Sequence, residues 1–244
     1  ILVFLELFAL LLILVIVVVV LMSQPGFEMA IQQLSTQMDA LDPQSKAAQD
    51  LIAPYLLKPG VISVSLLYFA MIVPMLEELL KPLGVWFFAS RLTSPAQGFA
   101  LGALSGSAYG LIETLGVSAQ TADWSTLMLS RIGTGALHIT TSAFMGAAIV
   151  YAVRERRYLR LLGTYALSVS LHALWNTIAI FFAFATISEY FELEHPLRAW
   201  TLPLNIGMAV FTVSLCGILV WSNRRMKLTI PVLVVIEHPS SENQ

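Results

Sequence analysis

The stretch that organises this chain reads Pro74-Met75-Leu76-Glu77-Glu78-Leu79-Leu80-Lys81, and it places two adjacent carboxylates inside a long apolar segment. A charge near the middle of a bilayer costs at least about 3 kcal/mol on insertion scales. Glu77 and Glu78 must therefore be shielded, partnered or protonated. Intramembrane carboxylates of this kind are candidates for function rather than for structure.

The composition indicates an integral membrane protein. Of the 244 residues, 57% are hydrophobic and only 11% are charged, and the mean hydropathy is +0.80, which lies far from the values of soluble domains. The few basic residues lie beside apolar segments and the formal net charge is -2, so we expect no nucleic-acid partner. A single cysteine, Cys216, excludes an intrachain disulfide and a cysteine-based zinc site.

Hydropathy predicts one all-α membrane domain over 1–244, a polytopic bundle with six transmembrane spans. The spans are expected at about 2–22, 61–89, 96–117, 126–153, 161–187 and 200–221. The first is longer than the apolar core of a signal peptide and lacks a small-residue cleavage site, which favours a span. The chain starts at Ile1 rather than Met, which leaves open whether the native protein has further N-terminal residues.

The distribution of basic residues predicts the orientation. Four arginines lie between 154 and 160, and the segment that follows the last predicted span is also basic. The positive-inside rule places both regions in the cytoplasm, so six spans give cytoplasmic N- and C-termini and a cytoplasmic tail over 223–244. Segment 23–60 is then extracytoplasmic. We expect the protein to lie in a prokaryotic cytoplasmic membrane.

Two local patterns concern packing. Apolar residues recur over 27–41 at intervals of four and three, which predicts either an interfacial helix above a cavity or an extramembrane helix packed on its neighbours. Gly98, Gly102, Gly106 and Gly110 follow one another at four-residue spacing. Such a face lets another backbone approach closely, and we favour a partner helix within the bundle over a second protomer, although the oligomeric state stays open.

Awkward polar residues lie on four of the predicted spans. At about 1.5 Å per residue, Glu77, Glu78, His138 and His172 fall at similar depths in the middle to inner part of the membrane. Glu113 comes out roughly 10 Å below the outer surface, higher than the others unless its helix is tilted or broken. Two histidines with three carboxylates suit a divalent metal such as Zn²⁺, or a carboxylate-activated water without a metal.

Local spacing adds three expectations. His172 and Asn176 lie four residues apart and share a helix face. Lys81 lies three and four residues after the glutamates, so we expect local ion pairs and a side chain that snorkels to the cytoplasmic interface. Pro74 and Pro82 should bend or break the second predicted span around the glutamate pair.

Four short motifs occur in order along the chain: Glu77-Glu78-Leu79-Leu80-Lys81, Tyr109-Gly110-Leu111-Ile112-Glu113, His138 after Arg131, and His172-Ala173-Leu174-Trp175-Asn176. In order and spacing they resemble the motifs of the PrsW family of intramembrane metalloproteases, which is similar to the CAAX prenyl endopeptidases and to the scaffold subunit of gamma-secretase. The resemblance covers about 61–179. The position of Tyr109 is commonly Phe in the family pattern.

The resemblance implies a role for each motif residue. Glu77 would activate water, and Glu78 would assist it or contact a metal. His138 and His172 would be metal ligands or oxyanion stabilisers, with Asn176 beside them.

Glu113 would be a further metal ligand or would orient one. The implied activity is metal-dependent hydrolysis of peptide bonds, with Zn²⁺ as the expected metal and a membrane-anchored protein or prenylated peptide in the lipid bilayer as substrate. The residues alone also allow a non-enzymatic transporter or proton relay, or a catalytically silent membrane scaffold.

Overall fold

The described part of this computed structural model comprises residues 11–16, 18–19, 22–23, 26–42, 45–118 and 124–227. Within these ranges the chain is helical almost throughout and contains no strand, which confirms the predicted all-α class. Much of the predicted span 2–22 and most of the predicted tail, residues 228–244, lie outside the described residues.

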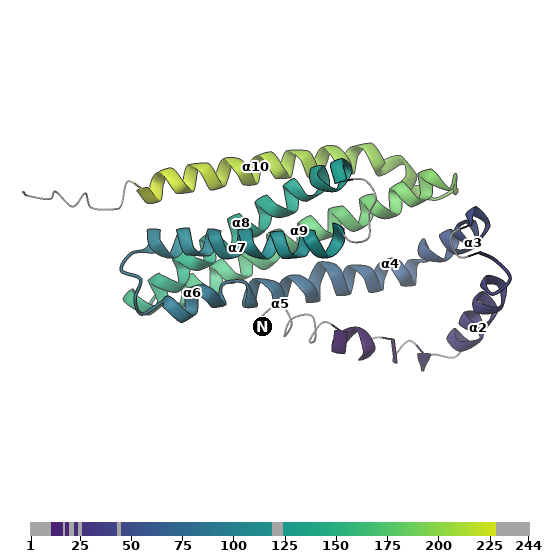
Figure 1. Cartoon of the computed structure of the whole chain (residues 1–244), viewed down its shortest axis with the longest axis horizontal. Coiled ribbons are helices and arrows are strands. Elements are labelled where there is room, and N and C mark those ends of the chain that lie inside the picture. Colours follow the sequence, from purple (N-terminus) through teal and green to yellow (C-terminus); the bar gives the residue numbers. More distant parts are fainter. Residues whose placement is uncertain are drawn as a thin grey trace, which may run out of the picture.

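Two short helices, α2 (Phe27–Met38) and α3 (Lys46–Leu56), precede a long rod of consecutive helices, and four longer elements complete the bundle (Figure 1). The rod comprises α4 (Pro59–Ser65), the π-helix η1 (Leu66–Ile72), α5 (Val73–Leu80) and α6 (Leu83–Phe88). It is followed by α7 (Pro95–Ser118), α8 (Trp124–Glu155), α9 (Tyr158–Tyr190), the 3₁₀ turn η2 (Pro196–Trp200) and α10 (Thr201–Lys227).

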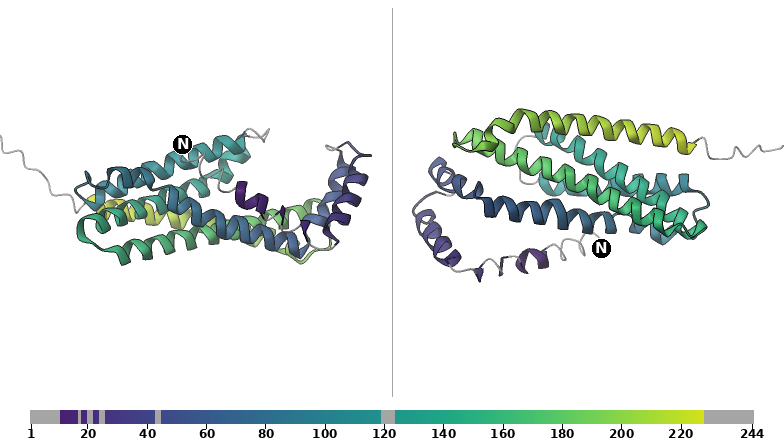
Figure 2. Two further views of the ribbon diagram at one scale, coloured as in Figure 1. Left: turned by 90° about the horizontal axis from the view of Figure 1, so that it is seen from below. Right: turned by 180° about the vertical axis from the view of Figure 1, so that it is seen from behind.

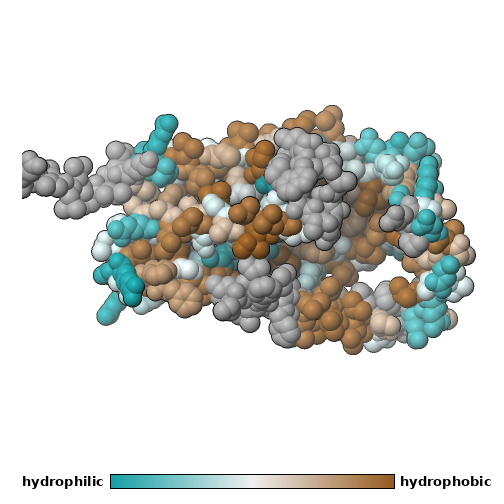
Figure 3. Space-filling view, viewed as in Figure 1, coloured by the Kyte–Doolittle hydropathy of each residue, from teal (hydrophilic) through white to brown (hydrophobic). Residues whose placement is uncertain are grey.

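Four helical stretches of the described residues are long and apolar enough to cross a membrane: Pro59–Phe88, Arg131–Glu155, Tyr158–Tyr190 and Pro196–Met226. α7 is not among them because its glycines and serines lower its hydropathy. The surface agrees with a membrane location, since apolar residues form a broad band between two hydrophilic ends (Figure 3). Many large apolar side chains in this band are exposed, as expected where lipid replaces water.

The tightest packing in the bundle joins α7 to α8. A Cβ atom built on Gly98, Gly102 or Gly106 would collide with the backbone carbonyl groups of Gly146, Ser142 and His138, respectively. The glycine face is therefore used inside the chain, as expected, and it brings the two backbones into direct contact. α8 becomes the central helix, with most of its membrane-spanning part buried.

Helix α9 lies between α10 and the α4–α6 rod (Figure 2) and also packs against α8. The rod is irregular at both prolines, as predicted. At Pro82 the helix breaks into a turn between α5 and α6. Ahead of Pro74 it widens, so that the N–H of Val73 bonds to the carbonyl of Tyr68, five residues back.

Candidate active site

The ammonium group of Lys81 lies at the centre of the predicted site. Its Nζ is 2.9 Å from Glu77 Oε2, 2.9 Å from Glu78 Oε1 and 2.7 Å from His138 Nδ1. The side chain is fully buried. The predicted ion pairs are confirmed, but the expectation that Lys81 snorkels to the interface is wrong, because the two carboxylates and the imidazole draw the ammonium into the bundle.

The imidazole of His138, on α8, is held at both nitrogens. Nδ1 faces the ammonium of Lys81, which can only donate, so Nδ1 accepts. Nε2 lies 2.7 Å from Glu113 Oε2 and donates its proton to that carboxylate. These contacts define a neutral imidazole whose Nδ1 lone pair points to the centre of the site.

His172, on α9, is oriented in the same way by a different carboxylate. Its Nδ1 is 2.8 Å from Glu78 Oε1, a better hydrogen bond than its 3.5 Å contact with Lys81 Nζ, so Nδ1 donates to Glu78. Nε2 is then left as the acceptor and lies 3.8 Å from Glu77 Oε2. Glu78 is completely buried behind this histidine.

The donor set fits a divalent metal. Glu77, His138 and His172 each offer one ligand atom, and these atoms lie within 4.8 Å of one another. Two imidazoles and a carboxylate match the ligands of catalytic zinc sites, and a carboxylate on the far nitrogen of each histidine is the usual support for such ligands. In addition, Glu78 Oε2 is buried without a hydrogen-bond partner among the described residues.

Glu113 reaches the site although its position along α7 predicted otherwise. Side chains on a helix lean toward its N-terminus, and α7 and α8 run in opposite directions, so Glu113 and His138 lean toward each other. Glu113 Oε2 also lies 2.6 Å from Nη2 of Arg131, whose Nε donates to Thr114 Oγ1. The pairing of Arg131 was not predicted; a lone arginine within an apolar helix was its only signal.

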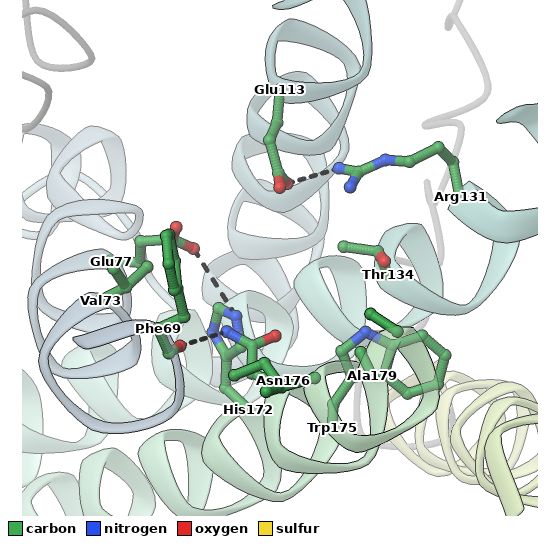
Figure 4. Close-up of a pocket in the computed structure, with 12 residues that line it drawn as sticks. Phe69, Val73, Glu77, Glu113, Arg131, Thr134, His172, Trp175, Asn176 and Ala179 are labelled. Carbon is green, nitrogen blue, oxygen red and sulfur yellow. Dashed lines mark hydrogen bonds and ion pairs between the residues drawn. The ribbon is translucent and has the colours of Figure 1, made fainter. Parts of the chain in front are cut away.

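A cavity of about 340 Å³ opens next to the cluster (Figure 4). Glu77 lines it, whereas Glu78 does not. One stripe of α9 forms much of its wall, made of His172, Trp175, Asn176, Ala179, Ile180 and Ala183. Glu113 and Arg131 lie together on another side, and their ion pair closes that part of the wall.

Comparison with known protein families identifies the family of this chain. The model of the PrsW family of intramembrane metalloproteases matches residues 4–215. This chain belongs to the PrsW family. It is therefore a membrane-embedded hydrolase of peptide bonds, and its family and its His/Glu group both support a divalent metal. No curated protein and no solved structure matches the chain significantly.

Asn176, the last motif residue of this PrsW-family chain, lies on the cavity wall but is not bonded to the histidines or glutamates. Its Nδ2 donates to the carbonyl of Phe69 at 2.7 Å (Figure 4). In the π-helical pattern that carbonyl would pair with residue 74, which is a proline and has no N–H. Asn176 thus replaces the missing donor and ties α9 to the irregular part of the rod.

Proposed function

We propose that this PrsW-family enzyme cleaves membrane-anchored proteins by a water molecule that Glu77 activates. The observation that carries this assignment is the position of Glu77, the member of the glutamate pair that lines the cavity. Lys81 Nζ pairs with Glu77 Oε2 at 2.9 Å, and the Glu77 carboxylate faces the cavity, where a water molecule can reach it. We assign to this carboxylate the acceptance of a proton from water and its return to the leaving amine.

The remaining residues would hold the metal and orient its ligands. His138 and His172 would bind a divalent metal, for which Zn²⁺ fits the donor set, with Glu77 beside them. When bound, such an ion supplies a Lewis acid for the scissile carbonyl. Glu78 keeps the Nδ1 proton on His172, and Glu113 keeps the Nε2 proton on His138. Both carboxylates thereby point a lone pair at the centre of the site.

Asn176 has a second N–H besides the one that it donates to Phe69. We assign this N–H to the oxygen of the scissile carbonyl, because Asn176 lines the cavity next to His172. The Asn176 side chain would then donate one N–H to the Phe69 carbonyl of the helix and the other to the substrate. An amide can do this, since its nitrogen carries two protons in one plane.

The cavity wall suggests how the substrate lies. Its α9 stripe from His172 to Ala183 is about 16 Å long at about 1.5 Å per residue. This matches about five residues of extended chain at about 3.3 Å each. A transmembrane substrate must be unwound to expose a peptide bond, because its helical backbone is internally hydrogen-bonded. The small side chains of Ala179 and Ala183 leave room for such a strand.

We also propose the six-span topology with cytoplasmic termini, in a prokaryotic cytoplasmic membrane. It adds α7 and the segment 2–22 to the four long apolar helices. At about 1.5 Å per residue, the 24 residues of α7 are long enough to cross the bilayer. Cysteines introduced at Arg156 and at Glu192 should react with membrane-impermeant reagents from opposite sides of the membrane.

The decisive experiment reconstitutes the full chain in liposomes with a single-span reporter protein. Glu77→Gln and His172→Asn should abolish cleavage while the helical content stays unchanged. Glu155→Gln, at the exposed end of α8, serves as the matched control. Cleavage at the wild-type rate by both site variants would refute the assignment. Ion or proton flux lost in these variants, without any cleaved product, would indicate a relay instead.

A further inference from the structure

The donors that suit a divalent metal are already in contact with a cation. Lys81 Nζ is 2.7 Å from His138 Nδ1 and 2.9 Å from Glu77 Oε2. These two atoms belong to residues of the candidate metal group. The lone pair of Nδ1 can be used only once, and two cations that share the same donors at such distances repel each other strongly in a site screened from water.

We propose that Lys81 is a resident cation that holds the donors together before a metal binds, and that metal binding expels its ammonium group from them. The inference rests on the proposed metal-dependent function of this site. It assigns Lys81 a positioning role: the side chain keeps two buried carboxylates and the His138 imidazole in place. It also sets how tightly a metal is held, because the metal must displace it.

The structure also contains a place for the displaced ammonium. Lys81 Nζ already lies 4.7 Å from the centre of the Tyr109 ring, within the range of a cation–π interaction. Tyr109 is on α7 and packs edge-on against the imidazole of His138, with 5.2 Å between the ring centres. A change in the Lys81 side-chain torsions can therefore move the charge from the imidazole to the neighbouring aromatic face while the backbone stays in place.

The backbone of Lys81 is held separately from its side chain. The hydroxyl of Ser105, on α7, donates to the carbonyl oxygen of Lys81. Pro82 follows and begins the turn into α6. The backbone of Lys81 is therefore fixed. The ammonium group can move between His138 and the Tyr109 ring by rotation about the bonds of the four methylene groups alone.

The test is a Co²⁺ titration of the full chain in detergent after all metals have been removed. The visible absorption of bound Co²⁺ measures how much of the ion is bound at each step. Lys81→Met removes the competing charge and should bind Co²⁺ at least tenfold more tightly than wild type. Lys81→Arg keeps a positive charge in a larger head group and should bind it more weakly. Lys58→Met, an exposed lysine at the start of α4, should match wild type.

Thermal unfolding gives a second measurement. Metal-free Lys81→Met should unfold at a lower temperature than wild type, because Glu77 and Glu78 lose their cation, and Co²⁺ should raise its unfolding temperature more than that of wild type. If Lys81→Met does not fold without metal, the weaker Co²⁺ binding of Lys81→Arg still tests the competition. Tighter binding by Lys81→Arg would overturn the proposal.

A double-mutant cycle tests the alternative position on Tyr109. Tyr109→Leu should weaken Co²⁺ binding when Lys81 is present and should leave it unchanged in the Lys81→Met background. Equal Co²⁺ affinities for wild type and Lys81→Met would overturn the proposal, as would the absence of Co²⁺ binding in every variant. These measurements need no substrate, so failure of the cleavage assay alone would refute the proposed function and leave this inference standing.

Discussion

The contact between Gly106 and His138 gives the sharpest prediction about how the fold sets the chemistry. A Cβ atom added at Gly106 would lie 2.8 Å from the carbonyl carbon of His138 and 2.9 Å from the Cβ of Ser142. Real Cβ atoms essentially never approach within 3.0 Å, and ordinary contacts begin at 3.4 Å. Both neighbours are fixed to the helix backbone, so neither can rotate away.

Gly106→Ala must therefore move α7 and α8 apart by about 0.5 to 1 Å near His138. Overpacking of this kind costs about 1–3 kcal/mol of stability. A displacement of about 1 Å at a catalytic group lowers turnover by about 100-fold. We expect both effects, because His138 of α8 is bonded to Glu113 of α7 across this helix pair and also contacts Lys81 at the end of α5.

The assay combines turnover of the reconstituted reporter with thermal unfolding in one detergent. Gly116→Ala is the control, since Gly116 is on the same helix and has no atom within 4 Å of the added methyl group. Wild-type turnover in Gly106→Ala would refute the reasoning, even if the unfolding temperature falls, because it would show that the glycine face stabilises the bundle without positioning His138.

Three further substitutions probe other contacts. Asn176→Asp exchanges a donor for a carboxylate against the Phe69 carbonyl; stability should fall by about 1–3 kcal/mol in chemical unfolding, and an unchanged midpoint would contradict the bond. Glu113→Gln should weaken metal binding by about 10–100-fold, measured by Co²⁺ titration, because His138 loses its carboxylate partner. Ala179→Phe should raise KM for the reporter and leave metal content at the wild-type level, since the ring fills the cavity and reaches no ligand.

Features that depend on composition and on local spacing in the sequence could be predicted. The helical class follows from long apolar runs, the break at Pro82 from the missing N–H, and the α7–α8 contact from the glycine spacing. The gathering of the glutamate pair, His138 and His172 also follows, because these residues were expected at similar depths and each needs a polar partner in lipid.

Features that depend on the direction in which side chains point between helices could not be predicted from the sequence. Depth along a helix axis misplaced Glu113, because the estimate ignored the lean and length of two side chains that point toward each other. The same gap explains Lys81: its spacing from the glutamates predicted the ion pairs but not their direction, and the two carboxylates at 2.9 Å hold the ammonium inside the bundle instead of letting it snorkel. The partner that Asn176 finds in Phe69 depends on a π-turn that spacing does not reveal.

Formal charge explains why a divalent ion suits this cluster better than the ammonium alone. Glu113 is matched by Arg131 at 2.6 Å, so that pair is neutral. Glu77 and Glu78 together carry two negative charges and share the single positive charge of Lys81, which leaves one negative charge uncompensated. A divalent cation carries twice the charge of the ammonium, so the doubly charged carboxylate pair attracts it more strongly, which in a low dielectric favours the exchange. Of the two carboxylates, Glu77 lines the cavity and Glu78 does not, so Glu77 is the group that can accept a proton from water there.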